Sequence, residues 1–466
     1  MTEPDALGGA GVAPPGAADD RYGLSPELVE AVGLALDDNH AYEAGMLVEP
    51  LRYAALADLI EVLGPERRER LIEVIRPRFD PEVLSELDET VRDEVAEQLG
   101  TESLAQAIAR LESDDALYLL SSLEETKQRA VLSAIPAALR ATLEEGLTFP
   151  EDSAGRLMQR EFVAVPRFWT VGETIDFMRE ATALPNDFYD IFVVDPRHRP
   201  VGTVALSRIL RSKRPVRIDD LMESAPVSIP VRMDQEEVAF VFRQHDLVSA
   251  PVVDDAGRLV GAITADDVMD VIDEEAEEDL MRLGGVREGD LYDDALQTGK
   301  ARSTWLAVNL CTAFLAAYAI GLFADTIQSI VMLAVLMPIV ASMGGNAGTQ
   351  TLTVVVRALA TREINRANAP RVLSKEILVG VMNGLGFAVL VGAIAWAWSG
   401  DPGIGAVIAG ALIVNMVVAG LAGTAVPLGL SRLGIDPAIA SGVFLTTITD
   451  VVGFCAFLGL ATLFLI

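Results

Sequence analysis

The chain has 466 residues, more than the roughly 100–200 residues that one domain usually holds. Its net charge of −32 is unevenly placed, because residues 299–466 hold eight basic and six acidic side chains, which leaves 28 basic and 62 acidic ones in residues 1–298. Such an acidic half should repel nucleic acid and attract cations, and the two cysteines, both in apolar runs, exclude a disulfide framework or a cysteine-based zinc site.

Residues 1–21 are rich in Gly, Ala and Pro and lack both a basic start and an early apolar run. They predict a disordered lead-in and not a signal peptide. Residues 22–150 follow with the periodicity of amphipathic helices, and similar Leu-rich motifs end at Leu63, Leu87 and Leu123, at spacings of 24 and 36 residues. This loose repetition predicts an acidic N-terminal domain of stacked helix pairs, in a small superhelix.

Two acidic residues in this region, Asp114 and Asp115, stand at the start of a predicted helix. Two interpretations stay open for them, because they can cap the helix or bind a cation. The other acidic side chains of the region are interpreted mainly as solvated helix faces.

Residues 151–272 contain an internal repeat. The segments 192–195 and 202–204 recur 59 residues later, and a Leu-Met pair precedes each copy. The order strand, helix, strand, strand, helix resembles a tandem pair of cystathionine-β-synthase (CBS) domains. The resemblance implies an α/β regulatory module, a type that often binds adenosine nucleotides, and it therefore favours gating over chemistry.

Residues 273–298 are predicted to form an acidic connecting helix, or plug helix, that leads into the first membrane span. Nine of the fourteen residues from 266 to 279 are acidic, and like charges at helical spacing repel one another unless cations bind between them. Such a run can be no more than a solvated face. Its position between the repeat and the first span favours divalent-cation binding with a coupling role.

Residues 299–466 are predicted to form a transmembrane domain of five helices, since a span needs about 20 mostly apolar residues. The five segments are 303–324, 328–356, 375–398, 404–430 and 437–464. Basic residues gather before the first span, between the second and third, and before the fifth, whereas the other loops carry only Asp325 and Asp401. The positive-inside rule therefore predicts a multi-pass protein of the cell membrane, with a cytoplasmic N-terminus and an extracellular or periplasmic C-terminus.

Asp450 lies midway along the fifth span, where a carboxylate costs about 2.5–3.5 kcal/mol unless it meets water, a partner or an ion. No Lys, Arg or His lies deep in any span to neutralise it. One interpretation is a protonated Asp450 that is hydrogen-bonded to Thr446 or Asn415. The favoured interpretation is a cation site in a pore.

The second span carries the polar, Gly-rich segment 344–350, which is unsuited to face lipid. It can be a helix-packing motif. Beside Asp450 it favours an unwound stretch that points backbone carbonyls into the pore. One carboxylate with hydroxyl, amide and carbonyl oxygens suits Mg²⁺, a hard cation that retains several waters.

The whole arrangement resembles the MgtE family of Mg²⁺ channels. The motifs that carry the resemblance are Pro338 followed by residues 344–350, Asp436-Pro437-Ala438 leading to residues 446–450, and Glu278-Asp279 followed by Leu283-Gly284. The family implies a homodimer with the pore on its axis, where Asp450 of both subunits holds a hydrated Mg²⁺. It also implies that Asp436 lies near the cytoplasmic mouth, and that acidic side chains in the cytoplasm bind Mg²⁺ and hold the closed state.

The candidate pore ligands are Asp450, Asp436, Thr446, Gly345 and Asn346. The candidate sensor ligands are Asp234, Glu236, Asp246, Asp267, Asp270, Glu275, Glu278 and Asp279, with Asp114 and Asp115 from the N-terminal region. Two positions depart from the family. Ser207-Arg208 replaces the Arg-Asp pair of its nucleotide site, so ATP binding to the CBS domains is doubtful, and Tyr118 or Leu119 replaces an acidic residue that follows the Asp-Asp pair.

We therefore predict a multidomain membrane protein that transports Mg²⁺ and that closes when cytoplasmic Mg²⁺ shifts its population to a compact state. The three histidines, His40, His198 and His245, lack the H-E-x-x-H spacing of a membrane metalloprotease, and no phosphate-binding loop of an ATPase is present. An enzyme is therefore not expected. Two alternatives stay open: a membrane-anchored divalent-cation sensor that does not conduct, and a channel for another divalent ion such as Co²⁺, Mn²⁺ or Ca²⁺.

Overall fold

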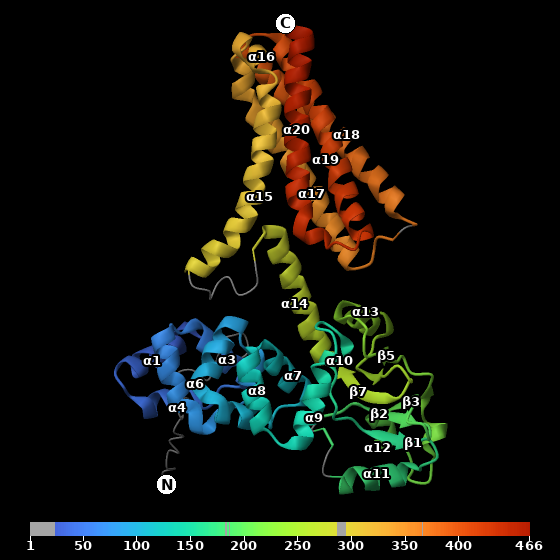
Figure 1. Cartoon of the computed structure of the whole chain (residues 1–466). Coiled ribbons are helices and arrows are strands. Elements are labelled where there is room, and N and C mark those ends of the chain that lie inside the picture. The colour runs from blue at the N-terminus through green and yellow to red at the C-terminus, as the bar shows by residue number, and fades with distance from the viewer. Residues whose placement is uncertain (1–23, 182–183, 186, 287–294, 366) are drawn as a thin grey trace, which may run out of the picture. The chain divides into compact units, whose positions relative to one another are not determined.

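The computed structural model describes residues 24–181, 184–185, 187–286, 295–365 and 367–466 (Figure 1). The chain separates between Asp273 and Glu274 into two compact units. The lead-in predicted for residues 1–21 lies outside the described residues.

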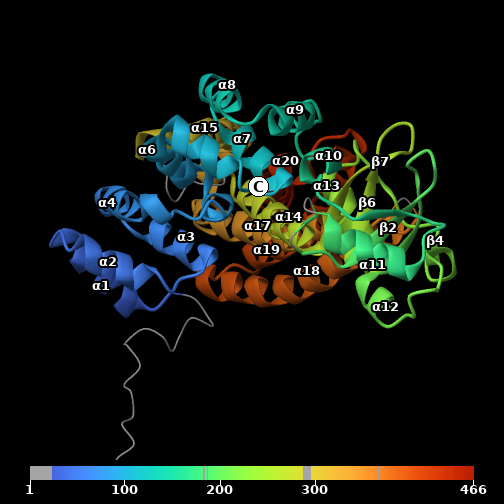
Figure 2. The same cartoon turned by 90° about the horizontal axis from the view of Figure 1, so that it is seen from below.

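The first unit begins with a row of short helices. They are α1 (Pro26–Asp37), α2 (Ala41–Val48), α3 (Tyr53–Val62), α4 (Pro65–Ile75), η1 (Arg76–Arg78), α5 (Val83–Glu86), α6 (Glu89–Ile108), α7 (Ser113–Ser122), α8 (Glu125–Ala134) and α9 (Ala137–Gly146). Ser25 caps α1 by accepting a hydrogen bond from the backbone N–H of Leu28, and Pro26 occupies its first turn. Contacts join α2 to α4, α3 to α5, α6 to α8 and α7 to α9, so the helices stack in pairs along a curved row (Figures 1 and 2). The predicted helical stack is confirmed.

An α/β region completes the first unit. Its elements are α10 (Ala154–Leu157), β1 (Ala164–Pro166), α11 (Val171–Glu180), β2 (Asp190–Val194), β3 (Pro200–Ala205), α12 (Leu206–Leu210), η2 (Ile218–Asp220), β4 (Glu223–Ser224), β5 (Ile229–Pro230), α13 (Gln235–His245), β6 (Ser249–Val253) and β7 (Leu259–Thr264). The strands form two sheets, in the orders β1-β2-β3-β4 and β5-β6-β7. In each sheet a parallel pair is followed by an antiparallel one.

The two sheets repeat each other residue by residue. Asp190 pairs with Ala205 in the first sheet, and Ser249 pairs with Thr264 in the second, an offset of 59 residues that also holds for the bulge in each strand pair. The offset predicted from the repeated segments therefore sets the same register in both copies, and the internal repeat is confirmed.

One helix, α14 (Ala265–Gly284), carries the acidic run. It begins directly after β7 and ends where Gly285 adopts a left-handed backbone with φ 70°. The acidic helix expected over 273–298 thus begins eight residues earlier than expected. It ends at Gly284, and residues 287–294 lie outside the described residues.

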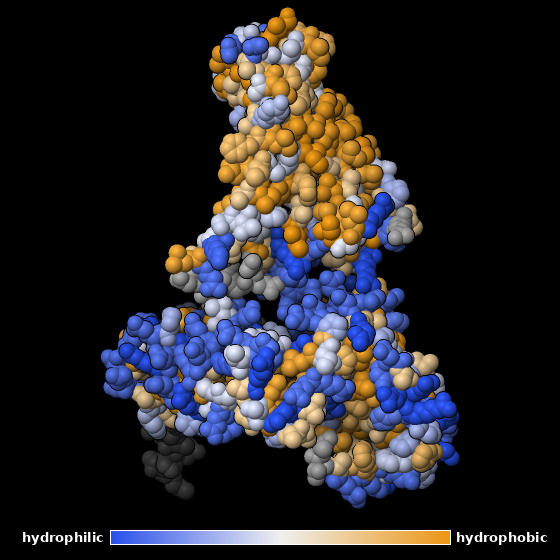
Figure 3. Space-filling model, viewed as in Figure 1, coloured by the Kyte–Doolittle hydropathy of each residue, from blue (hydrophilic) through white to orange (hydrophobic). Residues whose placement is uncertain are grey.

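The second unit contains the membrane helices. They are α15 (Ala295–Gly321), the short α16 (Ala324–Ser329), α17 (Met332–Ala360), α18 (Ala369–Ser399), α19 (Pro402–Arg432) and α20 (Pro437–Leu465). Five of these helices are long and apolar enough to cross a membrane, as predicted. Figure 3 shows that apolar side chains cover most of the visible surface of these helices.

The Gly-rich segment of the second span is continuous helix within α17, so the predicted unwinding is wrong. Two of its glycines are pressed against neighbouring helices instead. A Cβ atom added at Gly344 would overlap the side chain of Asn415, and one added at Gly348 would lie 2.8 Å from Cδ1 of Leu445. The small residues therefore let helices approach, and the helix keeps its own backbone hydrogen bonds.

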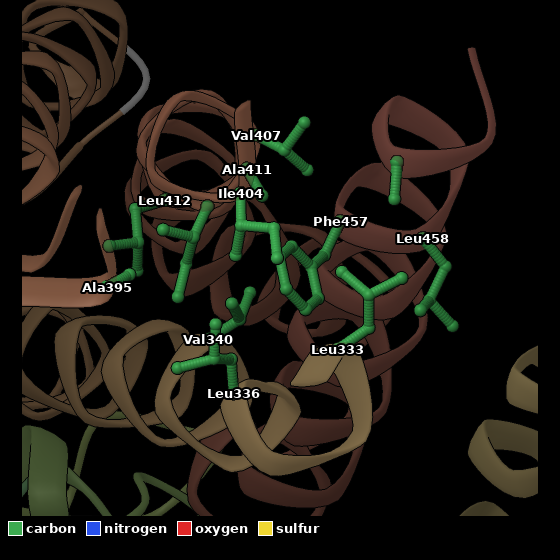
Figure 4. Packing of buried hydrophobic residues seen from close by; sticks show 12 residues of the cluster. Leu333, Leu336, Val340, Ala395, Ile404, Val407, Ala411, Leu412, Phe457 and Leu458 are labelled. Atoms are coloured by element: carbon green, nitrogen blue, oxygen red, sulfur yellow. The ribbon is translucent and has the colours of Figure 1, made fainter. Parts of the chain in front are cut away.

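A compact apolar cluster holds α17, α18, α19 and α20 together (Figure 4). Leu336 and Val340 of α17, Ile404 and Leu412 of α19, and the fully buried Phe457 of α20 all belong to this cluster. The cluster fixes the helices that carry the polar residues of the second and fifth spans.

Glycine packing in α19 gives a test of this arrangement. A Cβ atom added at Gly420 would lie 2.6 Å from the backbone oxygen of Glu376, whereas one added at Gly429 of the same helix meets nothing within 4 Å. We expect Gly420→Ala to destabilise the membrane unit by about 1–3 kcal/mol, because helix backbones must move apart. Gly429→Ala is the control, and thermal unfolding in detergent is the measurement. Equal midpoints for both variants would contradict the packing.

Candidate ion pathway and acidic clusters

Asp450 lies half-buried in the middle of α20, with no hydrogen bond or ion pair to any residue that the structure describes. Neither partner considered for a protonated Asp450 is hydrogen-bonded to it, although Oδ1 of Asn415 has no partner among the described residues. The hydroxyl of Thr446 donates to the backbone oxygen of Gly442 at 3.0 Å, and the amide of Asn415 donates to the backbone oxygen of Val340 at 2.9 Å. Because no described residue is bonded to the carboxylate, the structure favours its interpretation as a site for water or a cation.

A stripe of exposed polar side chains runs along α17. Ser342, Asn346, Thr349 and Thr353 are exposed, and their spacing places them on one face of the helix. They bond only within the helix, as when Asn346 Nδ2 donates to Ser342 Oγ at 3.4 Å. An apolar membrane helix does not expose such a face to lipid. Of the predicted pore residues, Asn346 belongs to this polar stripe. Gly345 is the residue before Asn346, and a Cβ atom added there would meet nothing within 4 Å.

Asp436 lies at the start of α20 and joins it to the acidic helix α14. One carboxylate oxygen caps α20 by accepting from the backbone N–H of Ala438 at 2.7 Å. The other accepts from Nη1 of Arg282 at 2.6 Å, and Nη2 of Arg282 pairs with Glu278. Burial, and then the neighbouring carboxylates of Asp436 and Glu275, raise the pKa of Asp279. The structure thus brings together four predicted ligands and adds a cation, Arg282, that sequence reasoning missed. The four ligands are Glu275, Glu278, Asp279 and Asp436.

The end of α14 is packed against membrane helices. Leu283 contacts the apolar cluster of Leu352, Val356, Ala438 and Leu445 on α17 and α20. A Cβ atom added at Gly285 would overlap the ring of Trp305 on α15. The C-terminal turn of α14 is therefore held by apolar contacts as well as by charge.

In the first unit, Asp114 and Asp115 of α7 lie close to Asp267 and Asp270 of α14. Asp114 is buried and its Oδ1 has no hydrogen-bond partner among the described residues. Asp267 accepts from the hydroxyl and the backbone N–H of Thr264, at 2.5 and 3.2 Å. The N-cap of α7 is Glu112, without a side-chain hydrogen bond, so the interpretation of the two residues as caps is wrong.

The electrostatics of this group of acids, which we call the α7–α14 cluster, are unfavourable for negative charge. Burial, and the nearby Asp267 and Asp115 carboxylates, raise the pKa of Asp114 well above its usual value. Burial also raises the pKa of Asp267 to about 7. Charged groups taken out of water need compensation, so the cluster suits a proton or a cation. The pKa of Glu86 is raised as well, by burial and then by Asp270, and this residue was missing from the predicted set.

The remaining predicted sensor residues are apart from this cluster. Asp234 caps α13 by accepting from the backbone N–H of Glu236 at 3.0 Å, and Asp246 ends the same helix in the left-handed conformation, with φ 51°. Within the described part of one chain, no group of three or more His, Cys, Asp or Glu side chains is arranged to hold a metal ion. A binding role for these three residues stays a prediction.

An arginine side chain takes part in the contacts at both positions that depart from the family. Arg208 donates to the backbone oxygen of Leu221 at 2.9 Å and pairs with Glu223 at 3.1 Å. The guanidinium of Arg92 lies 4.6 Å from the centre of the Tyr118 ring, a cation–π contact. The positive charge of Arg92 thus lies against Tyr118, one of the two residues that can replace the family's acidic side chain.

Comparison with known proteins covers most of the chain. Residues 337–460 match the model of the MgtE family, described as a divalent cation transporter. Residues 51–152 match the MgtE intracellular N domain, and residues 154–214 and 218–274 each match a CBS domain.

The relatives include the magnesium transporter MgtE of Thermus thermophilus, 34% identical over 370 residues, which cover 78% of this chain and 79% of the relative. The chain belongs to the MgtE family. The magnesium transporter MgtE of Bacillus subtilis is 27% identical over 440 residues, covering 94% of this chain and 98% of the relative. A solved cytosolic domain of the Mg²⁺ channel MgtE in complex with ATP is 29% identical, and it covers 52% of this chain and 99% of its own, with a TM-score of 0.48.

Membership of the MgtE family confirms the resemblance drawn from the motifs. It also confirms the predicted series of an intracellular N domain, a CBS pair and a membrane region of five apolar helices. The family is one of multi-pass membrane transporters and not a known class of enzyme.

The raised pKa values of the α7–α14 cluster predict a dependence of stability on pH. A carboxyl group whose folded pKa is about 7 stabilises the fold fully below its unfolded pKa of about 4, and this contribution is lost as the pH rises through 7. Without divalent ions, we expect the soluble unit of the full-length protein to unfold several degrees lower at pH 8 than at pH 6, followed by calorimetry. Added Mg²⁺ should raise the unfolding temperature at pH 8 and so remove the difference between the two pH values.

Asp267→Asn tests the assignment, because it removes one titrating group of the cluster and one of its negative charges. This variant should lose part of the pH dependence and part of the stabilisation by Mg²⁺. Glu97→Gln, at an exposed position of α6, is the matched control. A variant that keeps the wild-type pH dependence would contradict the assignment.

Proposed function

We propose that this chain transports Mg²⁺ across the cell membrane through a pore that passes Asp450. The observation that carries the proposal is this carboxylate, half-buried in a membrane helix with no partner among the described residues. Relatives over most of the chain are named magnesium transporters. Carboxylate, hydroxyl and amide oxygens are suitable ligands for a hydrated Mg²⁺.

The pore forms between two copies of the chain. Each copy contributes one Asp450, and a single carboxylate is a poor site for a divalent ion. The polar stripe of α17 supports this assembly, because its exposed side chains need water or a second copy beside them. Thr446 is exposed one turn before Asp450 and adds polar surface to the same pathway.

The N-terminal unit faces the cytoplasm and the C-terminus lies outside, in agreement with the basic residues in the loops. With this orientation, an inside-negative potential drives Mg²⁺ inward. The potential supplies about 2.3 kcal/mol per elementary charge per 100 mV, so no ATP hydrolysis is needed.

Cytoplasmic Mg²⁺ closes the pore by binding to acidic side chains outside the membrane. The α7–α14 cluster supports this proposal, because its carboxylates are buried together and the described residues give them no basic partner that could neutralise them. An ion that binds the compact state better than the open one shifts the population toward closure. At low Mg²⁺ the repulsion between the carboxylates favours separation, and the pore opens.

The pore assignment is tested by Mg²⁺ uptake into proteoliposomes. Asp450→Asn removes one charge per copy with little change in volume, and we expect uptake to fall to the level of empty liposomes. Asp325→Asn removes an exposed carboxylate of α16, which is not one of the helices that carry the proposed pathway, and should conduct like the wild type. Uptake of Co²⁺, Mn²⁺ and Ca²⁺ in the same assay measures selectivity. If neither the wild type nor the control conducts, the anchored-sensor interpretation takes the place of the channel.

The sensor assignment is tested with Mg²⁺ added on the side of the N-terminal unit. Asp114→Asn weakens ion binding in the α7–α14 cluster, so more Mg²⁺ is needed for closure. We expect the half-inhibiting concentration to rise about ten-fold, the factor that corresponds to about 1.4 kcal/mol of lost ion binding. Glu97→Gln should leave it unchanged. An unchanged value for Asp114→Asn would remove this cluster from the sensor.

A further inference from the structure

Arg282 is placed among the carboxylates that the sequence predicted as Mg²⁺ ligands. Its guanidinium pairs with Glu278 one turn earlier on α14, and with Asp436 at 2.6 Å across to the start of α20. The neighbouring Asp279 lies close enough to Asp436 for its pKa to be raised by burial and then by that carboxylate. One fixed positive charge is thus shared by a group of negative charges.

The surroundings of Arg282 hold it in place. Its side chain is 37% exposed, and those of Glu278 and Asp436 are 30% and 26% exposed, so the contact is partly shielded from water. The next residue, Leu283, packs on α17 and α20, and Gly285 lies against Trp305. The planar guanidinium can bind two carboxylates at once, which an ammonium group does less well.

We propose that Arg282 is a tethered cation that holds the end of α14 on α20 without Mg²⁺ and that competes with Mg²⁺ for Glu278 and Asp436. The proposal rests on the gating function proposed above and assigns a regulatory residue to the inner mouth of the pore. Arg282 acts through α14 and does not contact the transported ion, so it is a positioning residue.

Competition follows from the geometry of the contacts. A divalent ion that binds Asp436 together with an acidic side chain of α14 must displace the guanidinium, since both cations need the same oxygens. Arg282 favours contact between α14 and α20 at any Mg²⁺ concentration, whereas Mg²⁺ favours it only when it is abundant. Removing Arg282 should therefore open the pore further when Mg²⁺ is absent and make closure depend more steeply on Mg²⁺.

The test uses Arg282→Gln in the full-length protein in proteoliposomes. We expect uptake without cytoplasmic Mg²⁺ to rise about three-fold over the wild type, the size expected for a partly exposed ion pair. At saturating cytoplasmic Mg²⁺ it should be as low as in the wild type. Arg432→Gln removes a basic side chain at the end of α19, where the structure gives it no ion pair with a described residue, and should match the wild type at both concentrations. Arg282→Lys should lie between the wild type and Arg282→Gln.

Amide hydrogen exchange of residues 274–284 supplies a second measurement that does not depend on conduction. Without Mg²⁺, these amides should exchange faster in Arg282→Gln than in the wild type, and Mg²⁺ should restore their protection. Uptake and exchange equal to the wild type would overturn the proposal. If Mg²⁺ does not slow the exchange of these amides in Arg282→Gln, the proposal is also overturned. The substitution would then have unfolded α14 and not merely released it from α20. A wild type that Mg²⁺ does not inhibit would instead contradict the gating function.

Discussion

Negative charge without matching positive charge is the constraint on which the organisation of this protein depends. In the membrane unit it takes the form of Asp450 alone within α20. In the soluble unit it takes the form of Asp114 and Asp267, buried near each other with raised pKa values. Burying a charge is costly unless a proton, a partner or an ion compensates it. The described residues supply no basic partner at either place, so a mobile cation is the compensation that the proposed function requires. Transport and sensing then use the same chemistry, oxygen ligands for a hard ion, in environments that differ in access to water.

The glycines of the membrane unit allow the helices that carry Asp450 and the polar stripe to pack closely. Because Gly344 and Gly348 accept the side chains of Asn415 and Leu445, α17, α19 and α20 pack closely while remaining fully helical. Their backbone groups stay satisfied within each helix, as the interior of a membrane requires. Under the proposed function, the polar side chains on the exposed face of α17 provide oxygen atoms of the pathway. Close packing and a polar face are therefore two uses of the same segment, one on each side of the helix.

Sequence reasoning predicted the elements better than their junctions. Apolar length gave the five spans, and the 59-residue offset gave the repeat of the two sheets, since these patterns are read directly from the sequence. Asp114 and Asp267 were both candidates, but their contact joins residues 153 positions apart and has no periodic signal. The unwinding expected in the Gly-rich segment was wrong, because glycine can serve close packing as well as irregular backbone. Arg282 was missed although it stands four residues after Glu278, since its second partner, Asp436, is 154 positions away. Asp234 and Asp246 occupy the two ends of α13, a position that the acidic pattern alone does not reveal, and their binding role stays a prediction.

The two acidic groups along α14 differ in the kind of cation available to them, and this difference bears on how a concentration can be sensed. A side-chain cation such as Arg282 is present at a fixed effective concentration, so it holds Asp436 even when Mg²⁺ in the cytoplasm is scarce. The α7–α14 cluster has no such partner among the described residues, so its occupancy follows the free ion. A ligand shifts an equilibrium only by its differential affinity for the two states. Under the proposed mechanism, the unpaired cluster therefore supplies the dependence on Mg²⁺, while the paired group sets the balance between open and closed states from which that dependence begins. A protein with Arg-paired carboxylates at both places would have a fixed balance and little response, and one with neither paired would close only where Mg²⁺ is abundant.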